Sequence, residues 1–355
     1  MRLAENPILN RVHTIGIVGA GGIVKTAHLP AYKNAGFNVS AIYDKDRSRA
    51  EVLALEFGIP KVCQSLDEIL RNSSLEIIDI AVPPDVQSLV VRQAVREGKH
   101  LLCQKPLARS ATEAKILVEV AKAAGVKLAV NVSMRWGPAN REIANLVRDG
   151  AIGQILSALF DVKYYEDWNV WPWLLHNDRL LILLDMIHIL DFIRTLMGEP
   201  LAVEARYGRA PDSDVAGETW ADVRLRYGNQ VVVRYDEDCR IPTQQTAARF
   251  RMKGTQASVS GTFGVYYNLP IGKADTLKVI PNGVEEHMVP EPELPGRWVP
   301  DSFSETMRSL MLAIENNSEP SNSGRDHLQT LTLIDSIYSA GKMELLSHRP
   351  VIDEI

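Results

Sequence analysis

The first 130 residues alternate between short apolar runs and longer segments that have helical periodicity. The run at residues 77–82, I-I-D-I-A-V, is apolar almost throughout, which is typical of a strand covered on both faces in a parallel sheet. Because strand and helix signals follow each other at a regular rhythm, the pattern predicts an α/β domain with a doubly wound parallel sheet. The expected strands are residues 12–18, 38–43, 77–82, 100–103 and 126–130, and the expected helices are residues 23–33, 47–57, 86–97 and 111–125.

After residue 130 the pattern changes to strand-like segments with few helices between them. We therefore expect two domains, an α/β domain at residues 1–130 and an α+β domain with a mostly antiparallel open sheet at residues 131–355. The C-terminal helices are candidates to pack back on the first domain. The expected strands of the second domain are residues 155–165, 220–235 with a turn at 228–229, 247–252 and 276–280, and its expected helices are residues 138–150, 180–197, 302–315 and 326–346.

The composition is that of a soluble globular protein, with 46% hydrophobic and 23% charged residues. A net charge of -5 gives no sign of a nucleic-acid partner or an anionic membrane. Residues 1–10 lack the apolar core of a signal peptide, and the most apolar region, residues 180–193, is too short and too charged to span a bilayer. The three cysteines show no C-x-x-C spacing, which predicts a reducing compartment and no zinc site. We therefore expect a cytoplasmic protein that binds no metal, membrane or nucleic acid.

A glycine-rich turn follows the first expected strand. Gly19 permits a tight turn, Gly21 lets a pyrophosphate approach the backbone, and a helix that starts after Gly22 at Ile23 offers free N–H groups to the phosphates. The third glycine of the G-x-G-x-x-G fingerprint is replaced by valine. Asp44 ends the second strand, where a carboxylate would meet the ribose hydroxyls of adenosine. The pattern predicts a dinucleotide site, and its competing interpretation is an empty turn between strand and helix.

Two further polar or rigid segments directly follow strands, which is where dinucleotides bind in doubly wound sheets. The proline pair that begins at Pro83 forms either a rigid wall or merely a stiff turn. Lys105 precedes a proline that excludes helical geometry, so its ammonium can be held over a bound substrate. On composition alone, a solvated surface lysine is the alternative.

The apolar helix expected at residues 180–197 carries three ionisable residues on one stripe. Asp185, His188 and Asp191 are each three positions apart, so they share a face that is otherwise leucine, isoleucine and methionine. Unpaired burial of such groups is costly. The stripe therefore indicates either a functional site or a satisfied Asp-His pair in the core.

Half of the six tryptophans fall within six residues just before this helix. They are Trp168, Trp171 and Trp173, and Arg179 follows them. Aromatic faces pack against C–H surfaces of a ligand, and indole N–H groups can reach its hydroxyls, which favours the wall of a ligand pocket. A contact with another subunit fits this composition equally well.

Taken in order, the motifs of this chain resemble those of the Gfo/Idh/MocA oxidoreductases over nearly its whole length. The resemblance implies a Rossmann domain followed by a domain whose open sheet often packs on another subunit, so a homodimer or homotetramer through that sheet is expected. It also implies oxidation or reduction of a carbinol carbon of a sugar, cyclitol or polyol with NAD(H) or NADP(H). The motifs are G-A-G-G-I with H-L-P, A-V-P-P, E-G-K-H, Q-K-P, R-W-G-P, H-x-x-D, D-S-F and S-G-R-D.

Residue roles follow from the same resemblance. Lys105 matches the lysine of the family's E-K-P motif, which hydrogen-bonds the reacting oxygen near the nicotinamide, and His188 matches the histidine that takes the hydroxyl proton. An ammonium and an imidazole suit these tasks. Asp44 favours NAD over NADP, which stays the alternative because basic residues follow. The expected cofactor-lining residues are Gly19, Gly21, Gly22, Ile23, Asp44, Pro83, Gln104 and Lys105, and the expected substrate-contacting residues are Arg135, Trp173, Arg179 and Asp185.

The chain also departs from the family pattern at three places near these residues. Gln104 replaces the glutamate of E-K-P, and Gln87 stands where a histidine is common. Asp185 lies three rather than four residues before His188, so it orients the histidine, helps to bind substrate or does neither.

The resemblance implies an NAD-dependent dehydrogenase that oxidises an aldose or polyol. The expected reaction converts a cyclic sugar hemiacetal to its lactone. The departures at residues 179–188 resemble a branch acting on pentoses, with a branched pentose such as D-apiose as the expected substrate. An NAD-dependent glycoside hydrolase of the same family and a non-catalytic, cofactor-bound sugar sensor are the alternatives.

Overall fold

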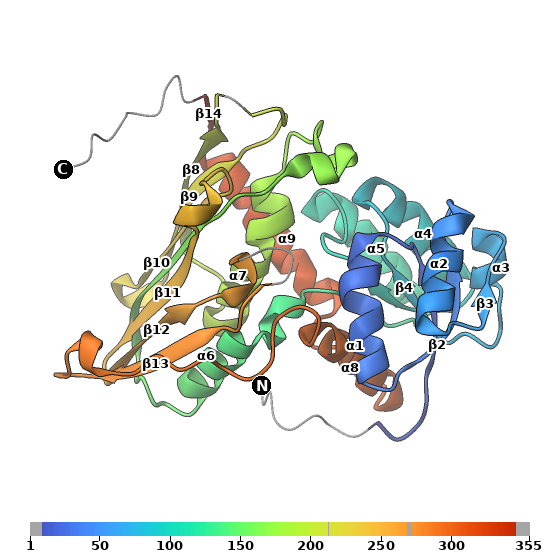
Figure 1. Ribbon diagram of the computed structural model, residues 1–355, viewed down its shortest axis with the longest axis horizontal. Helices are drawn as coiled ribbons and strands as arrows, with labels where there is room; N and C mark the ends of the chain where they lie inside the picture. The colour runs from blue at the N-terminus through green and yellow to red at the C-terminus, as the bar shows by residue number, and fades with distance from the viewer. Residues whose placement is uncertain (1–8, 212, 268–271, 346–355) are drawn as a thin grey trace. The chain divides into compact units, whose positions relative to one another are not determined.

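The computed structural model describes residues 9–211, 213–267 and 272–345, and it divides into two compact units. The first unit comprises residues up to Gly137 together with Trp298–Thr332. The second unit comprises Pro138–Arg297 together with the residues from Leu333 onward. The polypeptide therefore leaves the first unit, builds most of the second and returns, as the change of colour along the ribbon in Figure 1 shows.

The first unit is built on a six-stranded parallel sheet with the order β3-β2-β1-β4-β5-β6. The order reverses between β1 and β4, which is the topological switch point where doubly wound sheets bind their ligands. The predicted doubly wound sheet is confirmed. Its strands are β1 (Thr14–Val18), β2 (Asn38–Tyr43), β3 (Lys61–Val62), β4 (Ile77–Ile80), β5 (His100–Cys103) and β6 (Leu128–Val130).

Three helices of this unit begin at a residue whose side chain caps them. Ser65 and Ser110 each accept a hydrogen bond from the backbone N–H three residues later, at 3.1 and 3.3 Å, and Asp46 caps the helix that follows β2. The helices are α1 (Leu29–Asn34), α2 (Arg47–Phe57), α3 (Leu66–Leu70), α4 (Pro84–Arg96), α5 (Ala111–Ala123) and α8 (Ser302–Glu315).

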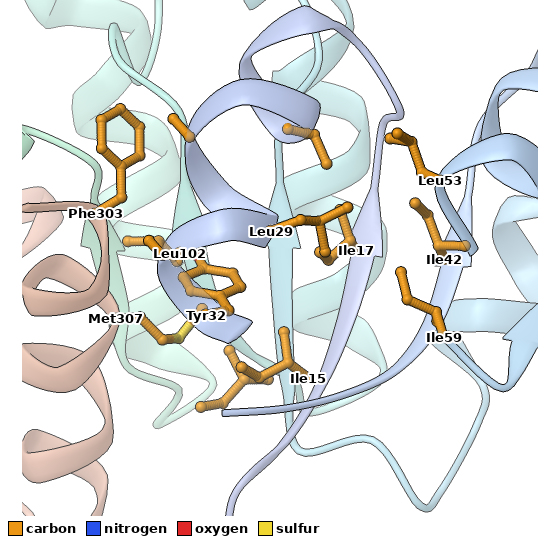
Figure 2. Close-up of a cluster of buried hydrophobic side chains, with 14 of the residues drawn as sticks. Ile15, Ile17, Leu29, Tyr32, Ile42, Leu53, Ile59, Leu102, Phe303 and Met307 are labelled. Carbon is orange, nitrogen blue, oxygen red and sulfur yellow. The ribbon is translucent and has the colours of Figure 1, made fainter. Parts of the chain in front are cut away.

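One apolar cluster joins the β1 side of the sheet to helices from both ends of the chain. Figure 2 shows Tyr32 beside Met307 of α8, the helix that returns from the second unit, and Ile15 and Leu29 belong to the same cluster. Phe303 and Met307 of α8 are 3% and 0% exposed in this cluster. The core of the first unit is therefore incomplete without residues nearly 300 positions along the chain.

The second unit contains an eight-stranded mixed sheet with the order β13-β12-β11-β7-β10-β9-β8-β14. Only β7 with β10 and β8 with β14 pair in parallel, so the expected mostly antiparallel sheet is confirmed. Its strands are β7 (Ile155–Lys163), β8 (Ala202–Arg209), β9 (Trp220–Arg226), β10 (Val232–Asp238), β11 (Ala247–Gly254), β12 (Ala257–Thr262), β13 (Thr276–Pro281) and β14 (Met343–Leu345).

The last predicted helix, residues 326–346, extends too far at its C-terminal end, and this part of the prediction is wrong. The helix α9 (Gly324–Ala340) ends before Gly341, where an added Cβ would lie 2.7 Å from the Tyr207 ring. Residues 343–345 then form β14, which pairs with β8. Position 346 lies outside the described residues. The strands β8 and β12 were not among the expected elements.

Two expected helices, at residues 23–33 and 180–197, begin instead with a π-helical turn. Val24–His28 precedes α1, and Ile182–Met186 precedes α7 (Ile187–Met197). Such turns are rare and often occur at functional sites. The remaining helix of the second unit is α6 (Pro138–Arg148), which lies with α7 on one face of the eight-stranded sheet (Figure 1). Within the described part of the chain, no helix is long and apolar enough to cross a membrane.

Candidate active site

The glycine turn is closed on one side and open on the other. Gly19 has φ +110°, and its N–H donates to the Tyr43 carbonyl at 2.8 Å. A Cβ at Gly19 would lie 2.3 Å from the Ala81 carbonyl oxygen, so only glycine fits between the ends of β1, β2 and β4. A Cβ at Gly21 or Gly22 would meet nothing within 4 Å. The backbone at these two positions can therefore be approached closely by another molecule.

Asp44 lies directly against this turn. Its Oδ2 accepts a hydrogen bond from the Ala20 N–H at 2.6 Å, and its Oδ1 accepts one from the Asp46 N–H at 2.8 Å. The end of β2 and the glycine turn are thus brought together, with Ile23 37% exposed at the start of the following helix. This is the geometry in which a carboxylate can reach a ribose beside a pyrophosphate.

The segments after β1, β4 and β5 emerge at one edge of the sheet. Val18, Ile80 and Cys103 form one row across these three strands, because Val18 pairs with Ile80 and Ile80 with Cys103. Gly19, Pro83 and Lys105 follow this row by one to three positions, so the structure brings these predicted site residues to the same edge. Pro83 is the residue that precedes α4, and Lys105 is partly buried.

The segment that carries Lys105 is held by two glutamine side chains. The Gln87 Nε2 donates to the carbonyls of Gln104 and Pro106, both at 2.9 Å, and the Gln87 side chain is fully buried. The Oε1 of Gln104 accepts from the Lys105 N–H at 3.0 Å. In the sequence, Gln87 is recognisable only as a departure from the family pattern. Its hydrogen bonds to the segment after β5 cannot be inferred from residue spacing.

Beneath the glycine turn lies a buried polar network that sequence reasoning missed. The Nδ1 of His28 and the Oδ2 of Asp79 are 2.7 Å apart, and the Tyr32 hydroxyl donates to the same Oδ2 at 2.8 Å. Asn131 contacts the Nε2 of His28 at 3.2 Å. His28 and Asp79 are both fully buried, so the network ties the π-helical turn to β4. The available signal was the single aspartate within the apolar run I-I-D-I.

The predicted substrate residue Arg135 is engaged within the first unit. Its guanidinium forms an ion pair with Asp326 and donates to the Ser321 carbonyl at 2.9 Å, and the residue is only 6% exposed. Its expected contact with substrate stays a prediction.

In the second unit, Asp185 occupies the π-helical turn and His188 the first turn of α7, where it is 7% exposed. Asp185 accepts a hydrogen bond from the Tyr164 hydroxyl through its Oδ2. Asp191 is fully buried on the same helix. Lys105 belongs to the first unit and His188 to the second.

Trp173 and Arg179 precede this helix in different surroundings. Trp173 lies in a short 3-10 turn and is 43% exposed. The guanidinium of Arg179 lies 2.6 Å from the Asp335 carboxylate and 4.2 Å from the centre of the Tyr338 ring. Arg179 is therefore held against α9, and its expected role in substrate binding stays a prediction.

A second acidic residue of this unit, Glu237, was also missed. It is fully buried on β10, and its Oε2 accepts a hydrogen bond from the Tyr235 hydroxyl. Burial and the charge of Asp185 raise the pKa of Glu237 well above its ordinary value. Burial also raises the pKa of Glu166 to about 7, with the charges of Asp185 and Asp167 adding to the shift.

Across residues 9–211, 213–267 and 272–345, no group of three or more histidine, cysteine, aspartate or glutamate residues is arranged to hold a metal ion.

Comparisons with known proteins cover both units. Residues 13–132 match the model of an oxidoreductase family with an NAD-binding Rossmann fold, and residues 140–260 match the GFO/IDH/MocA C-terminal domain. The chain is 28% identical over 337 residues to a D-apiose dehydrogenase of Paraburkholderia graminis, covering 92% of this chain and 87% of that protein. It is 25% identical over 335 residues to a D-xylose 1-dehydrogenase (NADP(+)) of Haloferax volcanii, covering 92% of this chain and 97% of that protein.

A solved structure shares the fold at lower identity. It is an oxidoreductase from Agrobacterium radiobacter in complex with NAD+, L-tartaric acid and magnesium, with a TM-score of 0.80, 21% identity, and coverage of 93% of this chain and 96% of that one. The two family matches span both the parallel-sheet unit and most of the mixed-sheet unit. The chain therefore belongs to the Gfo/Idh/MocA family of NAD(P)-binding oxidoreductases.

Proposed function

We propose that this protein is an NAD-dependent dehydrogenase that oxidises an aldose or polyol, converting a cyclic hemiacetal to its lactone. The observation that carries the proposal is the edge of the parallel sheet, where the open glycine turn, the Asp44 carboxylate and Lys105 come together. D-Apiose is the first substrate to test, because two relatives named D-apiose dehydrogenase are 28% and 22% identical over 92% and 94% of this chain.

The residues at this edge fit a dinucleotide. The open backbone at Gly21 and Gly22 would hold the pyrophosphate, and Asp44 would accept hydrogen bonds from the ribose. Asp44 also favours NAD, since its charge repels the 2′-phosphate of NADP. Two nearby arginines already form ion pairs with other carboxylates, which reduces their ability to attract that phosphate. Arg47 lies 2.6 Å from Glu51, and Arg49 lies 3.2 Å from Asp46. Ile23, Pro83 and Gln104 complete the proposed cofactor site.

When bound, NAD supplies the acceptor for a hydride from the carbon that is oxidised. We assign to His188 the removal of the hydroxyl proton from that carbon, because an imidazole titrates near neutral pH. Lys105 would stabilise the negative charge that develops on the oxygen as the proton leaves. The neutral Gln104 places no second charge beside this ammonium. In this assignment Trp173, Arg179 and Asp185 supply contacts to the sugar.

We also propose a homodimer or homotetramer that forms through the eight-stranded sheet. On the central strand β7, Leu159 is 41% exposed, and its neighbours in register are Arg234 and Arg251. Sedimentation of the wild type and of Leu159→Glu tests this assignment. We expect an oligomer that the glutamate weakens, and a monomeric wild type would refute it.

One experiment tests the catalytic proposal. The protein is incubated with NAD and with a panel of aldoses, polyols and aryl glycosides, while NADH absorbance and the products are followed. A dehydrogenase forms NADH and oxidised product in equal amounts, a lactone from an aldose or a carbonyl compound from a polyol, with the largest rate expected for a pentose. Glycoside cleavage without net NADH would instead indicate a hydrolase of the family, and binding without turnover a sensor.

A further inference from the structure

The helix that carries Asp185 and His188 begins at a residue that cannot cap it. The Leu180 carbonyl accepts the first bond of this helix, from the Leu184 N–H at 2.8 Å, so Leu180 holds the N-cap position just before the π-helical turn. A leucine side chain has no acceptor for the N–H groups that a helix leaves unsatisfied at its start. Leu180 and Ile182 are both fully buried. Their N–H groups therefore need an acceptor from elsewhere in the protein.

Glu218, from the loop before β9, supplies this acceptor. Its Oε1 accepts from the Ile182 N–H at 2.9 Å and from the Leu180 N–H at 3.2 Å, and its Oε2 lies 3.3 Å from the Leu180 nitrogen. Ile182 is the second residue of the helix, whose N–H is one that a capping side chain normally binds. A carboxylate also places negative charge at the positive end of the helix dipole. Glu218 therefore does from a distant loop what a serine or an aspartate at the N-cap does locally.

A third donor, from the part of α9 that belongs to the second unit, also holds this carboxyl group. The Tyr338 hydroxyl donates to the Oε1 of Glu218, and the Arg179 guanidinium lies 4.2 Å from the centre of the Tyr338 ring. Glu218 is fully buried. Burial raises the pKa of Glu218, and the hydrogen bonds from Tyr338, Ile182 and Leu180 oppose that shift. The carboxyl group thus joins the start of the helix to α9.

The backbone on either side of Glu218 is fixed as well. A Cβ at Gly217 would lie 2.6 Å from the Leu180 Cβ and 2.7 Å from the Asn177 carbonyl oxygen, so only glycine lets the loop approach the helix this closely. On the other side, the Thr219 N–H donates to the Gly208 carbonyl of β8 at 2.8 Å. The Glu218 side chain therefore projects from a backbone that is held at both neighbouring residues.

We propose that Glu218 is a positioning residue that caps this helix and thereby fixes the places of Asp185 and His188. The helix runs without a break over residues 181–197, so both side chains are carried by the segment whose start Glu218 holds. The proposal rests on the proposed function, in which His188 is the base. A displacement of about 1 Å at a reacting group can cost about 10²-fold in rate, so a helix start that loses its cap should lower kcat.

The kinetic test compares Glu218→Ala with Asp275→Ala. Asp275 is 3% exposed, and its carboxylate also binds the start of a helix, where it accepts from the Ala139 N–H of α6 at 3.0 Å. The helix α6 carries none of the proposed site residues, so this control removes a similar cap at a different place. We expect Glu218→Ala to lower kcat for the sugar roughly ten- to hundredfold with an unchanged Kd for NAD, and Asp275→Ala to keep both within about threefold.

Glu218→Gln is the conservative variant. It keeps the side-chain volume and one oxygen that can accept from the Ile182 N–H, so it should fold and should lose less of kcat than Glu218→Ala. A Glu218→Gln variant that loses as much as Glu218→Ala would contradict a role carried by the bond to Ile182.

Hydrogen exchange at the helix start keeps the cap separate from the enzymatic assignment. We expect the amides of residues 180–184 to exchange faster in Glu218→Ala than in the wild type, with a smaller change in Glu218→Gln and none in Asp275→Ala. Wild-type exchange at these residues in Glu218→Ala would overturn the cap, even if the wild type proves to have no dehydrogenase activity. In an active wild type, an equal loss of kcat in Glu218→Ala and Asp275→Ala would overturn the positioning role, and so would a loss of NAD binding that matches the loss of kcat.

Discussion

Replacing Gly21 with alanine separates the contribution of the glycine turn to the fold from its contribution to cofactor binding. The added Cβ meets no protein atom within 4 Å, so the substitution removes only backbone freedom from the unfolded chain. The expected change in the free energy of unfolding is a gain of about 0.4–1 kcal/mol. If a pyrophosphate lies on this backbone, the methyl group must displace it at a cost of about 1–3 kcal/mol, which weakens NAD binding roughly five- to 150-fold.

Gly19→Ala should have the opposite profile. The backbone at Gly19 has φ +110°, and the new Cβ would lie 2.3 Å from the Ala81 carbonyl oxygen. Backbone strain and overpacking each cost about 1–3 kcal/mol, so the loss in unfolding free energy should be about 2–6 kcal/mol. A loss of this size is a large part of the stability of an ordinary domain.

Calorimetric titration with NAD and urea denaturation measure the two effects on the same samples. Gly228→Ala is the matched control, because its Cβ also meets nothing within 4 Å and it lies in a turn of the second unit. If Gly21→Ala binds NAD within twofold of the wild type, the pyrophosphate does not lie on this backbone. If Gly19→Ala unfolds at the wild-type urea concentration, the close approach to Ala81 does not exist in solution.

Four further substitutions test other parts of the molecule. His188→Ala should lower kcat about 10²- to 10⁴-fold with an unchanged Kd for NAD, and activity near the wild-type level would exclude it as the base. Asp44→Asn keeps one of the two acceptor oxygens and removes the charge, so the ratio of the NADP Kd to the NAD Kd should fall roughly tenfold or more in paired titrations. The folded state raises the pKa of Glu166 to about 7, so unfolding releases its proton and stability is lost as the pH rises from 4.5 towards 7. Denaturation of Glu166→Gln over this range should show a smaller loss. Asp79→Ala breaks the buried contact with His28 and should cost about 3–5 kcal/mol of unfolding free energy, measured with urea.

The elements of the first unit could be predicted because their signals are local. The segments β5 and α2 have the predicted bounds, since a buried parallel strand is continuously apolar and α2 ends at Gly58, which has φ +70°. The strand β12, A-S-V-S-G-T, consists of small residues without clear alternation, and its register with β11 and β13 defines it. Nothing in the local pattern distinguishes the two π-helical turns from ordinary helix.

The residues of the candidate site also divide into those with a local sequence signal and those that only long-range pairing reveals. Gly19 and Asp44 were found because strand ends and glycine turns have a sequence signature, and the structure brings them together. Glu237 was missed because it lies in the run D-E-D, which is typical of a solvated surface. Only the pairing of β10 with its neighbours turns Glu237 inward while the flanking aspartates face outward.

The return of the chain to the first unit restricts how the two halves can be exchanged by recombination. A single crossover near Gly137 would separate residues 1–137 from α8, which supplies Phe303 and Met307 to their core. A productive exchange of the whole second unit needs three junctions, after residues 137, 297 and 332, and the last one falls inside the continuous helix α9. New substrate specificities in this chain should therefore arise by substitution and loop change within the second unit more readily than by replacement of the whole unit.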